Sequence, residues 1–507
     1  MNRLSALVLV VVYFVLHVGR APVFAAETGG VQIAVRDGRE LVPCRIHIYD
    51  SEGKTPKISG GPFWNDHIVC EAGGRFELPA GNYRYEIERG PEYSSAGGRM
   101  TVLSGGDVGL AADLVRLADL ASQGWWSGEL HVHRPLEDIP LLLRAEDLHV
   151  APVITWWNDR NLWVARQPPA QQVVAFDRNR FYNLMAGEDE REGGALLYFG
   201  LTQPLPITQA EREYPSPMLY LREARTHAGV HVDVEKPFWW DVPVWLASGQ
   251  IDTLGIANNH MCRSTLHPNE AWGKPRDRER LPVPRGNGYW SQEIYYHALN
   301  CGLRVPPSAG SASGVLPNPV GYNRVYVHVD GPLSYEKWFE GLRAGCTFVT
   351  NGPLLRVTAN GRLPGFVFTA NDQVDLDLSG ILEGRDTVED IEIIRDGNVV
   401  QKLPAAQLAK GGSLGKLTFK SSGWFLVRAI ADHSRTFRFA STAPWYVEVG
   451  ESKKRVSRAS ARFFLDWTDE RMKRINLGDP LKREEVLEPH RRAREFWANL
   501  VETADAE

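Results

Sequence analysis

A short apolar strand that ends in two histidines decides the fold: Trp125-Trp126-Ser127-Gly128-Glu129-Leu130-His131-Val132-His133. Side chains alternate between the two faces of a β-strand, so His131 and His133 are expected on one face. Neutral imidazole is a common ligand of zinc, iron and manganese, and the pair would supply part of a metal site. The alternative is two surface histidines on an amphipathic strand. Because Arg134-Pro135 follows at once, the imidazoles are expected at the carboxyl end of the strand, where α/β barrels hold their catalytic groups.

Around this strand, short apolar segments alternate with helical ones. Strands are expected at 150–155, 195–199, 229–234 and 251–256, and helices at 215–227, 242–248 and 291–301. Strands that alternate with helices are typical of parallel βα units. Residues 119–350 are therefore predicted to form an α/β barrel or an open α/β sheet.

Two β-rich regions flank this central part. Residues 27–118 and 351–450 contain short runs of alternating apolar and polar side chains, which predicts one β-sandwich on each side. In the first region, Gly74 to Tyr83 resembles the turn of transthyretin-like and carboxypeptidase-regulatory-like modules, which are accessory domains. Residues 451–507 are charged, with periodic apolar positions, and are predicted to form a helical tail.

The first 26 residues have the features of a secretory signal peptide. A positively charged start precedes an apolar run from Leu4 to Val18, and Ala25 and Ala26 offer a cleavage point. The protein is therefore expected to be secreted or to reach the periplasm or cell envelope, with no membrane span after cleavage. An uncleaved membrane anchor is the alternative, although the run is shorter than the ~20 residues of a typical span.

Composition narrows the range of partners. The net charge is −5 and no long basic run occurs, which argues against a nucleic-acid partner. Of the five cysteines, Cys44 and Cys70 fall in the same predicted domain, so a disulfide between them is one possibility and two free thiols the other. The sequence carries no signal for the oligomeric state.

The central region resembles the polymerase and histidinol phosphatase (PHP) superfamily. The stretch from Gly128 to His133 is similar to the first motif of its metal-dependent hydrolases, Asp-Leu-His-x-His, and Ala186-Gly187-Glu188 resembles the strand whose Glu bridges metals. Residues 321–327 and 345–354 are similar to the end of the carbaryl-hydrolase-like branch. The resemblance covers about residues 119–360. It implies a distorted (β/α)7 barrel of PHP type, with metals at the carboxyl ends of the strands.

Three motifs depart from the family pattern. Thr155-Trp156-Trp157-Asn158 stands where the family has Thr-Asp-His-Asn, and Lys236-Pro237 replaces His-Pro. The late Gly-Ser-Asp-x-His reads Gly310-Ser311-Ala312-Ser313-Gly314. Because three ligand clusters are altered, a complete two- or three-metal centre is not implied.

The remaining candidate metal ligands are His131, His133, Glu188, His231 and His260. They suffice for one or two divalent ions, zinc, manganese or iron, with an open position for water. His231 shares a face of its strand with Asp233 and Glu235. Those three side chains are expected to be further ligands, a hydrogen-bonded shell that orients His131 or His133, or solvent-facing positions.

Candidate catalytic and substrate-binding residues surround these ligands. Asp159 or Asp233 is a candidate general base, and Lys236 or Arg191 would neutralise developing negative charge. The alternative for each is a structural salt bridge. Arg191 is also a candidate for contact with substrate. Further candidates are three tryptophans that each stand next to another tryptophan in the sequence: Trp157, Trp239 and Trp240. The alternative for these tryptophans is packing in the core.

These features lead to two functional hypotheses. The first is an exported hydrolase that cleaves an ester, amide, carbamate or phosphate bond of a small molecule or glycan with metal-activated water. The second is a catalytically silent PHP-like scaffold that binds a glycan or another ligand through Trp-rich loops.

Overall fold

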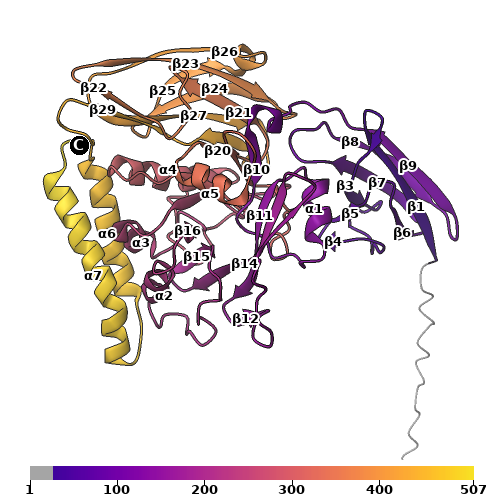
Figure 1. The fold of residues 1–507 in the computed structure, drawn as a ribbon, viewed down its shortest axis with the longest axis horizontal. Coiled ribbons are helices and arrows are strands. Elements are labelled where there is room, and N and C mark those ends of the chain that lie inside the picture. Colours follow the sequence, from indigo (N-terminus) through magenta and orange to yellow (C-terminus); the bar gives the residue numbers. More distant parts are fainter. Residues whose placement is uncertain (1–26) are drawn as a thin grey trace, which may run out of the picture.

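A computed structural model of the protein describes residues 27–507. The chain is a mixed α/β protein with several sheets, one of them large and mixed (Figure 1). The predicted signal peptide, residues 1–26, lies outside the described residues. Among the residues that are described, none of the helices combines the length and the apolar character needed to cross a membrane.

The N-terminal region is built from two facing sheets. One sheet contains β1 (Thr28–Asp37), β2 (Glu40–Leu41), β6 (Arg75–Pro79) and β9 (Asp107–Asp113). The other has the order β4 (Phe63–Trp64), β5 (His67–Cys70), β3 (Cys44–Tyr49), β7 (Gly81–Glu88) and β8 (Ala96–Val102). Alternation along β1 buries Val31, Ile33 and Val35 between the sheets. Cys44 and Cys70 lie opposite each other on β3 and β5 as free thiols.

The central region contains most of the large sheet. Its elements are, in chain order, η1 (Ala121–Gln123), β10 (Trp125–Gly128), α1 (Ile139–Ala145), β11 (Val150–Trp157), β12 (Arg160–Asn161), β13 (Val173–Phe176), β14 (Arg180–Arg191), β15 (Gly194–Phe199), α2 (Pro217–Ala224), β16 (His231–Val234), α3 (Val242–Ser248), β17 (Thr253–Ala257), α4 (Gly286–Asn300), β18 (Pro307–Ala309), β19 (Arg324–His328), α5 (Tyr335–Arg343) and β20 (Thr347–Thr350). Parallel pairs join β10 to β11, β11 to β14, β16 to β17 and β17 to β18.

The expectation of parallel βα units is wrong at β15, which is antiparallel to both β14 and β16. The reason is the connection: only Glu192 and Gly193 separate β14 from β15, and two residues can join antiparallel strands but not parallel ones. Gly194 has a φ of 122°, and a Cβ at this position would lie 2.3 Å from Cβ of Trp239. The tight turn therefore needs glycine.

The C-terminal β-region packs a small sheet on an extension of the large one. The small sheet contains β21 (Leu354–Ala359), β23 (Val374–Glu383) and β26 (Gly412–Phe419). The facing strands are β22 (Val367–Ala370), β24 (Val388–Arg395), β25 (Asn398–Pro404), β27 (Gly423–Ala431), β28 (Phe439–Thr442) and β29 (Trp445–Val449), with η2 (Ala405–Leu408) between β25 and β26. Because β20 pairs with β28, the central and C-terminal regions share one sheet.

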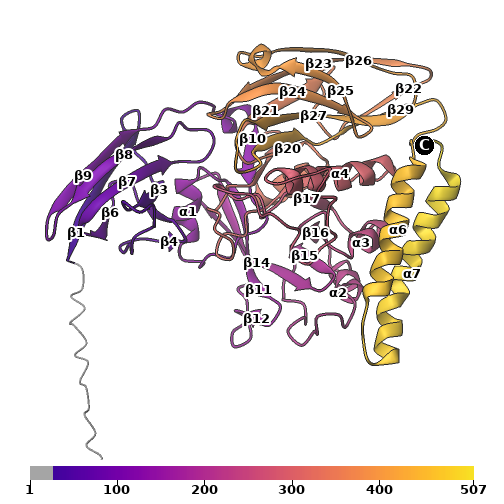
Figure 2. The ribbon, with the colours of Figure 1, turned by 180° about the vertical axis from the view of Figure 1, so that it is seen from behind.

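The chain ends in an antiparallel pair of helices, α6 (Arg458–Arg474) and α7 (Pro480–Thr503), drawn in yellow along one side of the central region (Figures 1 and 2). Trp497 is fully buried and its Nε1 donates a hydrogen bond to the carbonyl oxygen of Pro243 at 3.0 Å. Arg471 Nε donates to Asp241 Oδ1 at 2.6 Å. The helices are thus fixed to the central region next to α3.

One buried carboxylate joins the three β-containing regions. Glu88, at the end of β7, pairs with Arg45 of its own region, with Arg263 of the central region at 3.0 Å and with Arg385 of the C-terminal region at 2.8 Å. These guanidinium groups outweigh the effect of burial and hold the pKa of Glu88 well below its usual value. The same carboxylate thus contacts all three regions.

Candidate metal centre

Three side chains from the central region converge on one point. His131 Nε2 and His133 Nε2 are 2.9 Å apart, and both face the same oxygen of Glu188, Oε2, at 3.3 and 3.1 Å. Their ligand atoms are close enough to hold one metal ion. The sequence prediction that both imidazoles point to one side is confirmed.

The two histidines lie on an extended segment just after β10. The segment is held on both sides: Ile154 N donates to Val132 O at 2.8 Å, and His133 N donates to Ser313 O at 2.8 Å. Val132 faces the core and is fully buried, as the alternation of side chains requires. On the other side, a Cβ at Gly310 would lie 2.5 Å from Cβ of His131, so the 310–314 loop packs directly on the ligand segment.

Glu188 reaches the histidines from the neighbouring strand β14, whose pairing with β11 sets it opposite Trp157. Its buried Oε2 makes no well-aligned hydrogen bond in the described part of the chain, even to the two imidazole nitrogens 3.1 and 3.3 Å away. Leaving a buried carboxylate oxygen without a partner is costly. A cation beside it would remove that cost.

The spacing of the three atoms fits a metal ion better than a set of hydrogen bonds. Ligands at ~2.0–2.1 Å from a tetrahedral zinc ion lie about 3.3 Å from one another. If both Nε2 atoms donated hydrogen bonds to Glu188, two N–H groups would lie side by side with their nitrogens only 2.9 Å apart. One ion inside the triangle would use all three lone pairs at once.

Glu235 lies behind His131. Its Oε1 faces Nδ1 of His131, the nitrogen on the far side from the triangle, at 3.4 Å. The Glu235 carboxylate is itself held by Asn259 Nδ2 at 2.6 Å, by Trp239 Nε1 at 2.9 Å and by Lys236 Nζ. In a metal-bound form, a proton on Nδ1 facing Glu235 would leave the Nε2 lone pair directed at the ion.

The charges around the triad favour a cation. Burial alone would lower the pKa of His131, but the carboxylates of Glu188 and Glu235 outweigh it and raise the pKa to about 10. Burial lowers the pKa of His133, and Glu188 offsets only part of this effect. Burial would raise the pKa of Glu188, but the two histidines hold it well below its usual value. The two carboxylates and the two imidazoles thus share one buried region. Because the imidazoles lie too close together for both to carry a positive charge easily, a cation there would balance the second carboxylate.

His231 and Asp233 do not join the triad. His231 Nε2 contacts Thr253 Oγ1 at 2.8 Å, and its ring packs against Phe199 and Phe339. Asp233 Oδ1 accepts from Thr253 Oγ1 at 2.6 Å. Burial lowers the pKa of His231 to about 3 and raises the pKa of Asp233 to about 6. Of the three side chains on this face, Glu235 is the one that contacts a member of the triad.

His260 also lies outside the triad. Its Nδ1 contacts the carbonyl oxygen of Asn269 at 3.2 Å, and its ring packs against Phe238 and His267. Burial, and then the positive charge of Lys236, hold the pKa of His260 well below its usual value. Lys236 itself is paired with Glu235 and lies over the ring of Trp239.

Trp157 lies beside the triad, with its ring centroid 4.9 Å from that of His133. Its Nε1 donates to Glu190 Oε2 at 3.2 Å. Burial and the charge of Glu188 raise the pKa of Glu190 to about 7. Sequence reasoning missed Glu190, although its position two residues after Glu188 on one strand already places both on the same face.

The other predicted site residues lie elsewhere. Asp159 is exposed in the turn between β11 and β12. Arg191 makes two hydrogen bonds with Asp189, at 2.6 and 2.8 Å, and lies over Tyr220. Trp239 and Trp240 are 0% and 2% exposed, so neither indole offers a face to a ligand in this conformation.

A second group of side chains, in the N-terminal sandwich, is also close enough to hold a metal ion: His47, Asp66 and His67. His47 and His67 lie opposite each other on β3 and β5. Here the two Nδ1 atoms face different oxygens of Asp66, at 3.2 Å from Oδ2 and 3.0 Å from Oδ1. Arg45 Nε donates to His47 Nε2 at 3.0 Å.

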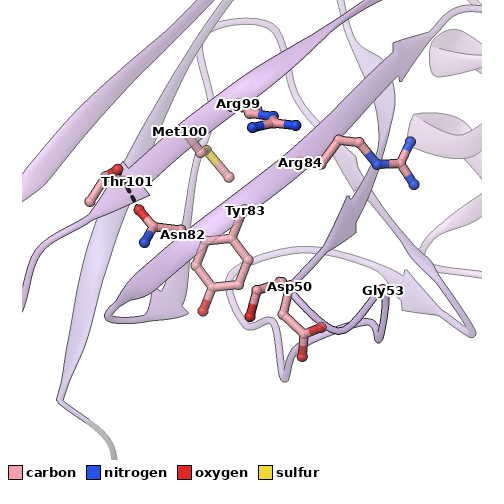
Figure 3. Close-up of a pocket in the computed structure, with 9 residues that line it drawn as sticks. Asp50, Gly53, Asn82, Tyr83, Arg84, Arg99, Met100 and Thr101 are labelled. Carbon is pink, nitrogen blue, oxygen red and sulfur yellow. Dashed lines mark hydrogen bonds between the residues drawn. The ribbon is translucent and has the colours of Figure 1, made fainter.

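Two pockets bear on the choice of site. One, of about 580 Å³, opens beside the triad and is lined by His133 and Trp157. Another, of about 670 Å³, lies on the N-terminal sandwich along β7 and β8 (Figure 3). There Thr101 Oγ1 donates to Asn82 Oδ1 at 2.7 Å, and the Arg84 and Arg99 side chains extend in different directions. Only the first pocket combines a void with converging ionisable groups.

Comparisons with known proteins give no family. No family model and no curated protein matches the sequence. Among solved structures, GBS52, the minor pilin of Streptococcus agalactiae, is 19% identical over 18% of this chain and 46% of its own, with a TM-score of 0.16. The TIE protein of Bacillus anthracis is 10% identical over 84% of this chain and 51% of its own, with a TM-score of 0.14. The chain thus spans about half of each, and at such TM-scores neither likeness bears on fold or function.

Proposed function

We propose that the protein is an exported metal-dependent hydrolase of the PHP type, which binds one divalent ion through His131, His133 and Glu188. The observation that carries this proposal is the triangle of two imidazole nitrogens and one carboxylate oxygen, with edges of 2.9, 3.3 and 3.1 Å. A His2Glu donor set occurs in zinc hydrolases and leaves a coordination position open. Zinc, manganese and ferrous iron all suit nitrogen and oxygen ligands of this kind.

We further infer that the central strands close into a distorted seven-stranded barrel. The support is a circuit of pairings that runs β10, β11, β14, β15, β16, β17 and β18. After β18 the chain pairs with the segment that follows β10: Leu130 N donates to Ala309 O at 3.0 Å, and Val132 bridges Ser313. The triad would then lie at one mouth of this barrel, where barrel enzymes hold their catalytic groups.

A bound divalent ion would supply a Lewis acid, which allows water to lose a proton near neutral pH and polarises the oxygen of the scissile group. Glu235 orients His131 through Nδ1, as the outer carboxylate does in many metal sites. We assign proton transfer to Glu190, which is only partly buried on the same face of β14 as Glu188. Trp157 lines the pocket and donates to Glu190 Oε2, which ties this carboxyl group to the pocket wall.

The scissile bond is an ester, amide, carbamate or phosphate bond, since each has an oxygen that a Lewis acid can polarise. The alternative, a silent scaffold that binds a glycan through Trp-rich loops, has less support. Trp239 and Trp240 are buried, and Trp157 alone of the three candidates lines the pocket beside the triad.

The proposal is tested by metal analysis and hydrolysis together. The protein is purified, treated with a chelator and reloaded with zinc, manganese or ferrous ion, and then assayed with 4-nitrophenyl acetate, 4-nitrophenyl phosphate and an aryl carbamate. We expect about one ion per chain and hydrolysis that is lost on chelation and restored by metal. His131→Ala should lack both, whereas His227→Ala, at an exposed histidine, should keep both. A wild-type protein that binds no metal would overturn the proposal.

A further inference from the structure

The pocket beside the triad has an unusual balance of charge. Besides His133 and Trp157, its wall carries Arg134, Arg160 and Arg166 but only one acidic residue, Glu137. The three arginines come from two segments: the first directly follows the metal-ligand segment, and the others belong to β12 and the loop after it. An excess of guanidinium groups on one wall favours a negatively charged ligand.

None of these arginines is well neutralised within the described chain. Arg160 and Arg166 have no carboxylate within 4.0 Å among residues 27–507, and lie instead over the rings of Trp157 and Trp163 at 5.2 and 5.1 Å. Arg134 is 6% exposed, and its nearest carboxylate oxygen, in Asp138, is 3.6 Å from Nη2. Its Nη1 is buried and has no hydrogen-bond partner in the described residues. Buried guanidinium groups are normally paired, so Arg134 has unused hydrogen-bonding capacity, and Arg160 and Arg166 add two exposed cations without a carboxylate partner.

The segment that carries Arg160 and Arg166 is anchored to the wall of the site. Trp163 Nε1 donates to Thr155 Oγ1 at 2.8 Å, and Leu162 N donates to the carbonyl oxygen of Thr155 at 2.9 Å. Arg166 Nε donates to the carbonyl oxygen of Leu162 at 2.9 Å, which leaves the terminal nitrogens of this side chain without a described partner. The segment that carries both arginines is therefore in place at the pocket before a ligand arrives.

We propose that this pocket binds an oxyanion of the substrate, a carboxylate or phosphate group next to the scissile bond, through Arg160 and Arg166, with Arg134 behind them. The proposal rests on the proposed function for its statement that the ligand is a substrate, because the pocket opens onto His133 of the triad. Arginine is suited to this task, since its planar fork matches the two oxygens of such a group. Esters and amides of similar shape that lack the anionic group are then expected to bind more weakly than those that carry it.

The test measures binding of benzoate, of the neutral and similarly shaped benzamide, and of inorganic phosphate to the metal-loaded protein by calorimetry at low ionic strength. Arg160→Gln/Arg166→Gln changes two exposed side chains, and Arg222→Gln, at an exposed arginine of α2 outside the pocket, is the matched control. We expect benzoate to bind at least about tenfold tighter than benzamide. The double variant should lose this difference while it keeps its metal, and the control should retain both.

Equal binding of benzoate by the wild type and the double variant at unchanged metal content would overturn this inference and leave the hydrolase proposal intact. Arginine-dependent binding of benzoate by a wild type that takes up no metal would overturn the hydrolase proposal and support the anion site alone. The two ligands distinguish the kind of anion. If the double variant loses more affinity for phosphate than for benzoate, the substrate group is a phosphate; if it loses more affinity for benzoate, the group is a carboxylate.

Discussion

The two histidine-carboxylate groups of this protein contain similar residues in different arrangements. In the central region, both Nε2 atoms of His131 and His133 face one oxygen of Glu188 and lie 2.9 Å from each other. In the N-terminal sandwich, His47 and His67 face separate oxygens of Asp66, at 3.2 and 3.0 Å.

This difference decides what each group needs. His47 accepts from Arg45 at Nε2, so its proton is on Nδ1 and is directed at Asp66. His67 can direct its Nδ1 proton at the second oxygen, so two separate imidazole–carboxylate contacts are available without an ion, although the buried Nδ1 of His47 makes no well-aligned hydrogen bond among the described residues. In the central triad both imidazoles face one carboxylate oxygen, so two separate contacts of this kind are not available there. Proximity of ligand atoms is therefore a weaker criterion for a metal site than the number of protons that the geometry can accept.

The largest expected effect separates the two groups by metal content. His131→Ala removes one corner of the central triangle, and we expect the affinity for zinc to fall by more than about 100-fold, to substoichiometric content after dialysis. His67→Ala should keep about one ion per chain. Plasma mass spectrometry of both dialysed variants measures this. Loss of metal from His67→Ala alone would reverse the assignment of the two groups.

A smaller effect is expected from Glu235→Gln, which keeps the shape of the side chain but removes the charge behind His131. Such outer carboxylates typically contribute about 10–100-fold to metal affinity. Competition with a chromophoric chelator measures the change, and Glu223→Gln, at an exposed position of α2, is the control. If Glu235→Gln binds zinc as tightly as the wild type, Glu235 does not orient this ligand.

Asp66→Asn should act on stability and not on metal content. Burial would raise the pKa of Asp66, but its contacts with His47 and His67 outweigh burial and hold the pKa well below its usual value. We expect the variant to lose about 1–3 kcal/mol of the free energy of unfolding near neutral pH. A carboxyl group whose pKa is lowered by folding stabilises the folded state at pH values above its pKa in the unfolded chain. The difference in stability between wild type and Asp66→Asn should therefore shrink below about pH 4.

Urea unfolding of wild type and Asp66→Asn at several pH values measures this difference. A loss that stays constant into acid would mean that the charge of Asp66 has no role. A loss of bound metal in this variant would show that the N-terminal group holds an ion.

The smallest effect is expected from Asp159→Asn. Asp159 is exposed in a turn and does not line the pocket beside the triad, so metal content and hydrolysis should stay near wild type and stability should change by less than about 0.5 kcal/mol. A large loss of kcat with unchanged metal content would instead support Asp159 as the general base that the sequence suggests.

The sequence predicted the parts of the site that follow from local periodicity. The alternation of side chains along a strand was enough to bring His131 and His133 together, and the resemblance to metal-dependent hydrolases pointed to Glu188. The same rule groups His231 with Glu235 on one face, yet His231 packs between two phenylalanines while Glu235 reaches His131. A strand fixes the face but not the neighbours, which come from other elements.

Longer-range pairing explains the remaining differences. Arg191 pairs with Asp189, two residues away on the same face of β14. Trp239 donates a hydrogen bond to Glu235, and its ring packs against Trp272. The antiparallel direction of β15 depends on a two-residue turn that is easily read as a gap between two parallel strands. These outcomes depend on tertiary contacts that no short stretch of sequence specifies.

The most direct test is an anomalous difference map, recorded at the zinc absorption edge from crystals of the zinc-loaded protein. We expect one peak, inside the triangle formed by His131 Nε2, His133 Nε2 and Glu188 Oε2. A peak between His47, Asp66 and His67, or a map without any peak at the central triad, would contradict it.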